Sequence, residues 1–348
     1  MLRRLASGLL ATAAFVAPLT ATAQEGRADD IGVMSISLVD VVKPTIGFQG
    51  ALQGAGTTNQ GGIGGFLPLS VGENSVWFLD ALVNANFGDR DDYSSIGDTL
   101  VTGTTLSTST RLGYRWLNGD RSWMYGINAG YDTRQMATGD TTNGLPIIDP
   151  QTVFFQQVAI NAETKSKKWG ASAYGLIPVG KYGYASDNVA TINSGFGAEP
   201  LTTVGFDIGY NILPDLSLTG GYYYQYCEKE PEKFKGYADG SGIKARLEYD
   251  ITDQLQAGVV YSYDDNFESR VSADLKVRFG GGDKSQTSAV IQALTATPTN
   301  RDVRIANSEE VETRQAVEER NLDELGMGWR HEWCGIEAWD PWECGWMF

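Results

Sequence analysis

The stretch RLGYRWLNGDRSWMYGINAGYD, residues 111–132, decides the fold of this chain. Its two halves flank Asn118-Gly119-Asp120, and this spacing predicts two antiparallel strands joined by a tight turn. Apolar side chains fill every second position of each half, while Arg, Asn, Asp and Gly predominate between them. Because side chains alternate between the faces of a strand, each strand has one apolar and one polar face. Such a polar face suits a water-filled lumen, so the stretch predicts a membrane-spanning barrel whose apolar side chains face lipid.

The N-terminus predicts export. Arg3 and Arg4 precede an apolar run over residues 5–19, which ends in the small-residue site Ala21-Thr22-Ala23. This order is typical of a cleaved signal peptide, which we place at residues 1–23. No later stretch reaches about 18 consecutive apolar residues, so we expect no membrane-spanning helix in the exported chain. A closed barrel also satisfies its backbone polar groups inside a membrane, and the export signal is therefore compatible with one.

The alternating pattern recurs through residues 44–280, which we expect to form the barrel after a short periplasmic lead at 24–43. It predicts about twelve strands of about ten residues each, long enough to cross a bilayer when tilted. Short turns follow every second strand and most other connections are long, an asymmetry typical of periplasmic turns and outer loops. The predicted strands are Thr45–Gly54, Gly61–Val71, Ser75–Phe87, Arg111–Trp116, Trp123–Asp132, Val153–Ala162, Trp169–Val179, Val204–Ile212, Leu216–Tyr226, Ile243–Ile251, Leu255–Tyr263 and Val271–Phe279. Aromatic residues near the strand ends should form interfacial girdles, with Trp77, Trp116, Trp123, Trp169 and Tyr263 as members.

The composition agrees with such a barrel and excludes other classes. The 348 residues include 42 Gly, 16 Tyr and 9 Trp, and their formal net charge is -16. This acidic balance argues against nucleic acid as a partner, because phosphates require a basic surface. With 3 cysteines and His331 as the single histidine, the chain predicts neither a disulfide scaffold nor histidine-based catalysis. We expect no enzyme activity and no cofactor, and the expected partners are the lipid and the assembly machinery of the outer membrane of a Gram-negative-type bacterium.

A soluble all-β sandwich or closed barrel is the alternative fold, because alternation alone does not distinguish lipid from a protein core. Charged residues throughout the opposite faces of most strands argue against a sandwich. The carboxylates on these faces have Arg or Lys neighbours, which favours a solvated or ion-paired lumen wall over acid–base chemistry. By alternation, the lumen-lining residues of the later strands are Asp207, Lys244, Arg246, Glu248, Asp274, Lys276 and Arg278.

Two stretches carry a family resemblance. Residues 111–132 hold the pattern R-x-G-Y-R-x-L followed by W-x-Y-G-x-N-x-x-Y-D, and residues 76–80 read VWFLD. The chain resembles the barrel domain of the inverse autotransporters, the intimin and invasin family, over residues 44–280. The resemblance implies an outer-membrane barrel of twelve strands whose C-terminal linker returns through the lumen and displays a passenger outside the cell. It also implies that the polar positions of the motif face the lumen, namely Asp80, Arg111, Arg115, Asn128 and Asp132.

The flanking segments depart from that family. Residues 24–43 hold no peptidoglycan-binding module, and residues 281–348 hold neither immunoglobulin-like repeats nor a lectin-like tip. Within this C-terminal tail, residues 302–305 are a candidate for an extended linker in the lumen. Residues 309–325 are acidic, with a spacing compatible with a short helix or with a disordered charge run.

The last twenty residues of the tail are rich in tryptophan, with Trp329, Trp333, Trp339, Trp342 and Trp346. This cluster is a small surface-exposed binding tip, a plug or an interface anchor. Cys334 and Cys344 are candidates for a disulfide, because an exported chain meets an oxidising compartment. A zinc site at His331, Cys334 and Cys344 lacks a fourth ligand, so we expect no metal.

Two functional classes follow from these observations. The first is a surface-display barrel that exports its own short tail, as the resemblance implies. The second is a passive porin-like channel for small polar solutes, in which the lumen charges select the solute. Residues 281–305 discriminate between them, because display requires this segment to thread the lumen. The sequence identifies neither a surface ligand nor a solute.

Overall fold

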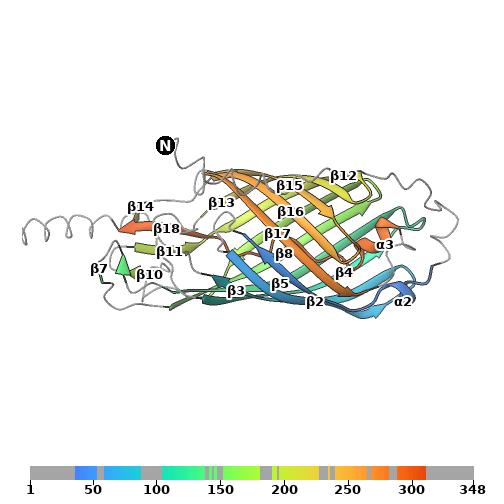
Figure 1. Ribbon diagram of the computed structural model, residues 1–348, viewed down its shortest axis with the longest axis horizontal. Coiled ribbons are helices and arrows are strands. Elements are labelled where there is room, and N and C mark those ends of the chain that lie inside the picture. Colours follow the sequence, from blue (N-terminus) through green and yellow to red (C-terminus); the bar gives the residue numbers. More distant parts are fainter. Residues whose placement is uncertain are drawn as a thin grey trace, which may run out of the picture. The chain divides into compact units, whose positions relative to one another are not determined.

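A closed antiparallel β-barrel of twelve strands forms the body of the molecule (Figure 1). The chain separates into two units, Met1–Ile36 and Ser37–Phe348, and the barrel belongs to the second. The expected signal peptide at residues 1–23 lies outside the described residues. The computed structural model describes residues 36–52, 59–87, 104–137, 141–142, 145–146, 152–180, 190–193, 196–226, 234–235, 240–264, 268–281 and 288–310.

The strand order around the barrel is β1-β17-β16-β15-β13-β12-β9-β8-β5-β4-β3-β2. The pairing of Thr45 with Gly280 and of Ala51 with Asp274 joins the first strand to the last, so the sheet has no free edge. The predicted all-β barrel of about twelve strands is confirmed. Its strands are β1 Thr45–Ala51, β2 Asn59–Val71, β3 Ser75–Phe87, β4 Thr104–Leu117, β5 Trp123–Ala137, β8 Thr152–Ser166, β9 Trp169–Pro178, β12 Thr202–Leu213, β13 Leu216–Tyr226, β15 Gly240–Asp250, β16 Leu255–Asp264 and β17 Glu268–Gly280.

Several strands are longer than the sequence predicts, β4 and β5 among them. β4 begins at Thr104 and β5 ends at Ala137, inside segments that we expected to be loops. Residues 104–110 are mostly threonine and serine, so they show no apolar period. Their backbones still pair, as Ser107 does with Arg134, because the ladder needs only backbone donors and acceptors.

The apolar faces of the strands point outward. Along β3, exposed and buried residues alternate: Trp77 is 49% exposed, whereas Asp80 is 2% exposed. The outward positions of the other barrel strands are also occupied by exposed aliphatic and aromatic side chains. An apolar surface of this extent belongs in hydrocarbon, so the barrel spans the outer membrane with these side chains against lipid. Among the described residues, no helix combines the length and the apolar character needed to cross a bilayer.

Aromatic side chains gather at the strand ends. Trp77, Tyr114, Trp116 and Tyr125 form a stacked row on neighbouring strands, with successive ring centroids 4.9, 5.5 and 5.9 Å apart. Trp123 and Trp169 each begin a strand, and Tyr263 is the second-last residue of β16. Aromatic rings at these positions lie where the headgroups of a bilayer meet its hydrocarbon.

The two ends of the barrel differ in their connections. One end carries the turns at 72–74, 118–122, 167–168, 214–215 and 251–254, and we call it the short-turn end. The connections at the opposite end are mostly longer, and we call it the long-loop end; they are 52–58, 88–103, 138–151, 179–201, 227–239 and 265–267. The turn predicted at 118–120 lies between β4 and β5, and the Asn118 side chain accepts a hydrogen bond from the Trp123 backbone at 2.9 Å. The hydroxyl and backbone N–H of Ser122 donate to the Asp120 carboxylate, and these bonds lower the pKa of Asp120.

Several small elements correct our expectation of irregular loops and tail. A four-stranded sheet has the order β10-β11-β18-β14 and joins two outer connections to the tail. Glu309 and Glu310 lie in β18, so the helix considered for residues 309–325 is wrong at its start because these residues pair with β11 and β14; residues 311–325 lie outside the described part. The bounds are α2 Leu38–Val41, β6 Thr141–Thr142, β7 Leu145–Pro146, β10 Ala190–Asn193, β11 Phe196–Pro200, β14 Phe234–Lys235, α3 Ala289–Ala293 and β18 Ile305–Glu310.

Candidate functional site: the occupied lumen

The lumen of the barrel contains the chain's own C-terminal segment, residues 288–305. At its start, Arg115 of β4 donates to the carbonyl oxygens of Leu294 at 3.0 Å and Ala296 at 2.7 Å. Near its end, Arg134 of β5 donates to the carbonyl oxygen of Val303 at 3.0 Å. Arg115 lies close to the short-turn end and Arg134 close to the long-loop end of these strands. The segment, called the lumen segment below, therefore runs along the lumen from the short-turn end to the long-loop end.

The short-turn end of the lumen holds α3. The Ser288 hydroxyl accepts a hydrogen bond from the Ile291 backbone and caps the helix. Arg115 satisfies carbonyl groups that the end of the helix leaves without intrahelical partners. Arg115 is 0% exposed, ion-pairs with Glu163 of β8 at 2.7 Å, and lies over the Phe78 ring at 4.5 Å. The helix end is thus fixed to the β3–β4–β8 wall by one arginine.

This part of the interior corrects the expectation of a polar, water-lined face. Phe66, Val76, Phe78 and Leu82 point inward and are buried, and the rings of Phe66 and Phe78 stack with centroids 5.2 Å apart. In α3 and its C-cap, the residues Val290, Ile291, Ala293 and Leu294 are also buried. Alternation assigns a side chain to a face but does not reveal what fills the space beyond it. Here buried apolar side chains of the wall and of the helix occupy part of the interior.

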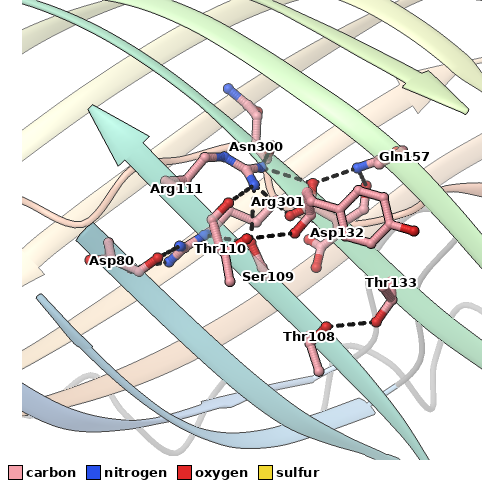
Figure 2. Close-up of polar contacts among 12 residues, drawn as sticks. Asp80, Thr108, Ser109, Thr110, Arg111, Asp132, Thr133, Gln157, Asn300 and Arg301 are labelled. Atoms are coloured by element: carbon pink, nitrogen blue, oxygen red, sulfur yellow. Dashed lines mark hydrogen bonds and ion pairs between the residues drawn. The ribbon is translucent and has the colours of Figure 1, made fainter. Parts of the chain in front are cut away.

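Halfway along, Arg111 and Asp132 form a buried ion pair (Figure 2). Two bonds join them, Nη1 to Oδ1 at 2.5 Å and Nη2 to Oδ2 at 2.8 Å. Gln157 of β8 donates to the same carboxylate at 2.9 Å, and Arg111 also donates to the backbone oxygen of Asn300 at 3.3 Å. A two-point arginine–carboxylate pair has a fixed orientation, so it presents the remaining donor of Arg111 to the lumen segment.

Asn300 and Arg301 contact different walls. The Asn300 amide donates to Asp207 of β12 at 3.1 Å and accepts from Lys244 of β15 at 2.8 Å. Arg301 ion-pairs with Asp80 of β3 at 2.6 Å and donates to the Ser109 hydroxyl of β4 at 2.9 Å. Figure 2 shows the Arg301 contacts beside the Arg111–Asp132 pair.

Close to the long-loop end, Arg304 completes the set of contacts. Its guanidinium lies 4.3 Å from the centroid of the Tyr223 ring and donates to the Gln225 side chain at 3.1 Å. The Tyr223 hydroxyl donates to Asp264 at 2.6 Å, which orients the ring. Val303 and Ile305 are 3% and 0% exposed. Buried side chains thus continue along the segment to the start of β18.

A separate charged cluster covers the β15–β17 wall. Arg246 ion-pairs with Glu248 at 2.8 Å and with Asp274 at 2.5 Å, and Lys276 lies 3.7 Å from Asp274. These side chains are 13–30% exposed and pair with one another. Arg278, farther along β17, donates to the Thr297 hydroxyl of the lumen segment.

The motif residue Asn128 makes no side-chain hydrogen bond to the lumen segment. It is 5% exposed and pairs in register with Asn161 of β8, yet neither amide has a hydrogen-bond partner among the described residues.

The sequence analysis did not identify several inward-facing residues that contact the ion pairs or the lumen segment. Gln157 and Glu163 share the inward face of β8, so alternation would have found them. Asn300 and Arg301 lie outside any regular strand, and only their polarity marked them, whereas Arg304 lies within the linker expected at residues 302–305.

Among the described residues, the polar side chains of the lumen hold one part of the chain against another. Within the described ranges, no group of three or more His, Cys, Asp or Glu is placed to hold a metal ion. The candidate disulfide Cys334–Cys344 and the zinc candidate with His331 lie outside the described residues. A cavity of about 10 Å³ beside Arg301, lined in part by Asn84, Ser109 and Thr133, has room for about one water molecule.

Comparisons with known proteins support the fold. No protein-family model matches the sequence, and no curated protein matches it. A structure from work on the in-meso crystallization of membrane proteins aligns with a TM-score of 0.53 at 11% identity, covering 76% of this chain and 99% of that one. An outer-membrane channel from Pseudomonas putida F1 aligns with a TM-score of 0.41 at 17% identity, covering 68% of this chain and 95% of that one. The KdgM porin aligns with a TM-score of 0.37 at 9% identity, covering 68% of this chain and 99% of that one. The first likeness supports the membrane-barrel fold and nothing finer.

Proposed function

We propose that this outer-membrane barrel displays the part of its own chain that follows the lumen segment, in the manner of the inverse autotransporters that the sequence resembles. The observation that carries the proposal is the course of residues 288–305 through the lumen. Contacts from Arg115, Arg111 and Arg134 hold this segment at successive heights. A segment held along its length, rather than at one end, is what a displayed linker requires.

The direction of the segment supports export rather than retention. Gly280 ends β17 beside Thr45, and the backbone of Arg278 bonds to Gln254 in a short turn, so the last strand ends at the short-turn end. In outer-membrane barrels, short turns face the periplasm. The chain therefore enters the lumen from the periplasmic side, and β18 continues it among the outer connections, paired with β11 and β14.

A porin-like channel is the second candidate, and the charged cluster of the β15–β17 wall favours it. Arg246, Glu248, Asp274 and Lys276 pair with one another, so they would remain as a charged wall if the lumen segment left. In this second candidate the segment leaves the lumen and the tail stays in the periplasm. Both candidates include insertion by the outer-membrane assembly machinery, and neither assigns a catalytic activity.

The two candidates make different predictions for an epitope tag placed after Phe348. Display predicts antibody staining of intact cells. The channel predicts staining only after the outer membrane is permeabilised. A second tag in the 252–254 turn serves as the periplasmic control and should stain only after permeabilisation.

Conductance in a planar bilayer completes the test. If the lumen segment seals the barrel, the full chain should conduct little, and a variant lacking residues 281–348 should conduct strongly. Equal and high conductance of both proteins, together with periplasmic staining of the tag, would contradict display.

A further inference from the structure

Asn300 and Arg301 are consecutive residues that bind opposite walls of the barrel. Asn300 contacts β12 and β15, whereas Arg301 contacts β3 and β4. In the closed order of strands, these two pairs lie about half a circumference apart. A two-residue step of the chain therefore bridges the lumen, and Figure 2 shows Asn300 and Arg301 beside Arg111 at this level.

The backbone at Asn300 makes this bridge feasible. Its φ is +56°, in the left-handed region that asparagine adopts more readily than most residues other than glycine. At this turn, Arg111 donates a hydrogen bond to the Asn300 carbonyl oxygen. The turn directs the Asn300 and Arg301 side chains to opposite walls.

The walls on both sides match these two side chains. Lys244 Nζ lies 3.0 Å from Asp207 Oδ1. The Asn300 amide donates to Asp207 and accepts from Lys244. Opposite them, Asp80 is 2% exposed and ion-pairs with Arg301. A shift of the segment by one residue would place Thr299 or Asp302 at these positions and leave buried charges unpaired.

We propose that Asn300 and Arg301 form a latch that stops the lumen segment at one register. The latch determines which residue emerges at the long-loop end, and in this respect it rests on the proposed display function. Asn300 and Arg301 are positioning residues: they fix the place of the segment without a role in binding any displayed partner.

Thiol accessibility measures the register. Val303 is 3% exposed, so a cysteine introduced there by Val303→Cys reports whether the segment has moved. The background replaces Cys227, Cys334 and Cys344 by serine, and a membrane-impermeant maleimide is added to intact cells. The cysteine at 303 should react slowly in the parent protein, and Arg301→Ala or Asn300→Asp should raise the rate about tenfold by releasing the segment. Asn300→Asp acts by placing a second carboxylate beside Asp207.

A compensating exchange separates the latch from general loosening. The double variant Asn300→Asp with Asp207→Asn keeps one amide, one carboxylate and Lys244 at the same site, so labelling should return to the parental rate. Asp302→Asn is the matched control, because its side chain is exposed and its backbone oxygen supplies the wall contact. It should label at the parental rate. Unheated gel electrophoresis verifies that every variant forms a folded barrel.

The latch is overturned if the single variants label no faster than Asp302→Asn, or if the exchange fails to lower the rate of Asn300→Asp. If Arg301→Ala or Asn300→Asp does not fold, the labelling rates of the double variant and of Arg301→Lys, which keeps the positive charge, are compared instead. The terminal tag tests display separately. A tag that stains only in permeabilised cells removes the display function, whereas the labelling rates still decide whether the segment is latched in the lumen.

Discussion

Arg111 and Asp132 face each other inside the barrel with two parallel bonds of 2.5 and 2.8 Å, and each side chain is 1% exposed. Asp132→Ala should destabilise the barrel by about 3–5 kcal/mol, because the substitution leaves a buried arginine without its partner. Urea unfolding in lipid vesicles, read by unheated gel electrophoresis, measures this loss. Asp253→Asn, in an exposed turn, is the control and should leave the midpoint unchanged. Equal midpoints for both variants would show that the pair contributes little.

Arg115→Glu should loosen the lumen segment. The new carboxylate would lie beside Glu163 and would face the carbonyl oxygens of Leu294 and Ala296 without a donor. Protease added to isolated outer membranes should then cleave the segment several-fold faster than in the parent. Lys168→Gln, which removes a cation from an exposed turn, is the control. Unchanged protection of the segment in the Arg115 variant would contradict the anchoring role.

Gly130→Ala should destabilise the barrel by about 1–3 kcal/mol through overpacking. A Cβ at this position would meet the Thr110 carbonyl oxygen at 1.8 Å and Arg111 Cδ at 2.8 Å, and the backbone atom cannot easily move. Gly220→Ala is the matched control, because a Cβ there would meet nothing within 4 Å. The same urea unfolding measures both variants, and a similar midpoint for the two would argue against the close approach at Gly130.

Leu247→Arg tests the lipid-facing surface. Leu247 is 44% exposed near the middle of β15, and arginine at the midplane of a bilayer costs about 2–4 kcal/mol. The folded fraction in vesicles should fall accordingly, whereas Leu247→Phe should fold as the parent does. A soluble protein would tolerate the arginine at an exposed site. Full folding of this variant in vesicles would therefore contradict the membrane assignment.

The alternation of side chains predicted the barrel well because it depends on local geometry. Every second residue of β3, from Trp77 to Val83, faces outward as the sequence indicates. The start of β4 and the end of β5 were missed because residues 104–110 and 133–137 pair through the backbone without an apolar period. The sheet around β18 was missed because its short strands depend on pairing between distant segments.

Of the candidate site, the sequence predicted residues of the barrel wall but not the contacts that the lumen segment makes with them. The motif marked Arg111, Arg115 and Asp132, but alternation could not reveal that Arg115 binds the backbone of the lumen segment. Periodicity carries no signal for a chain that crosses a lumen without regular structure, so the roles of Asn300 and Arg301 required the structure. The apolar filling around Phe78 was missed for the same reason.

Cross-linking within the lumen determines whether the C-terminal segment occupies the barrel. Two cysteine pairs, Arg278→Cys with Thr297→Cys and Gln225→Cys with Arg304→Cys, sample contacts toward the two ends of the lumen. Thr108→Cys with Thr133→Cys, in register on β4 and β5, is the positive control. In a cysteine-free background treated with a short bis-maleimide in outer membranes, we expect intramolecular cross-links in all three variants. A cross-link in the control alone would contradict the presence of the segment in the lumen.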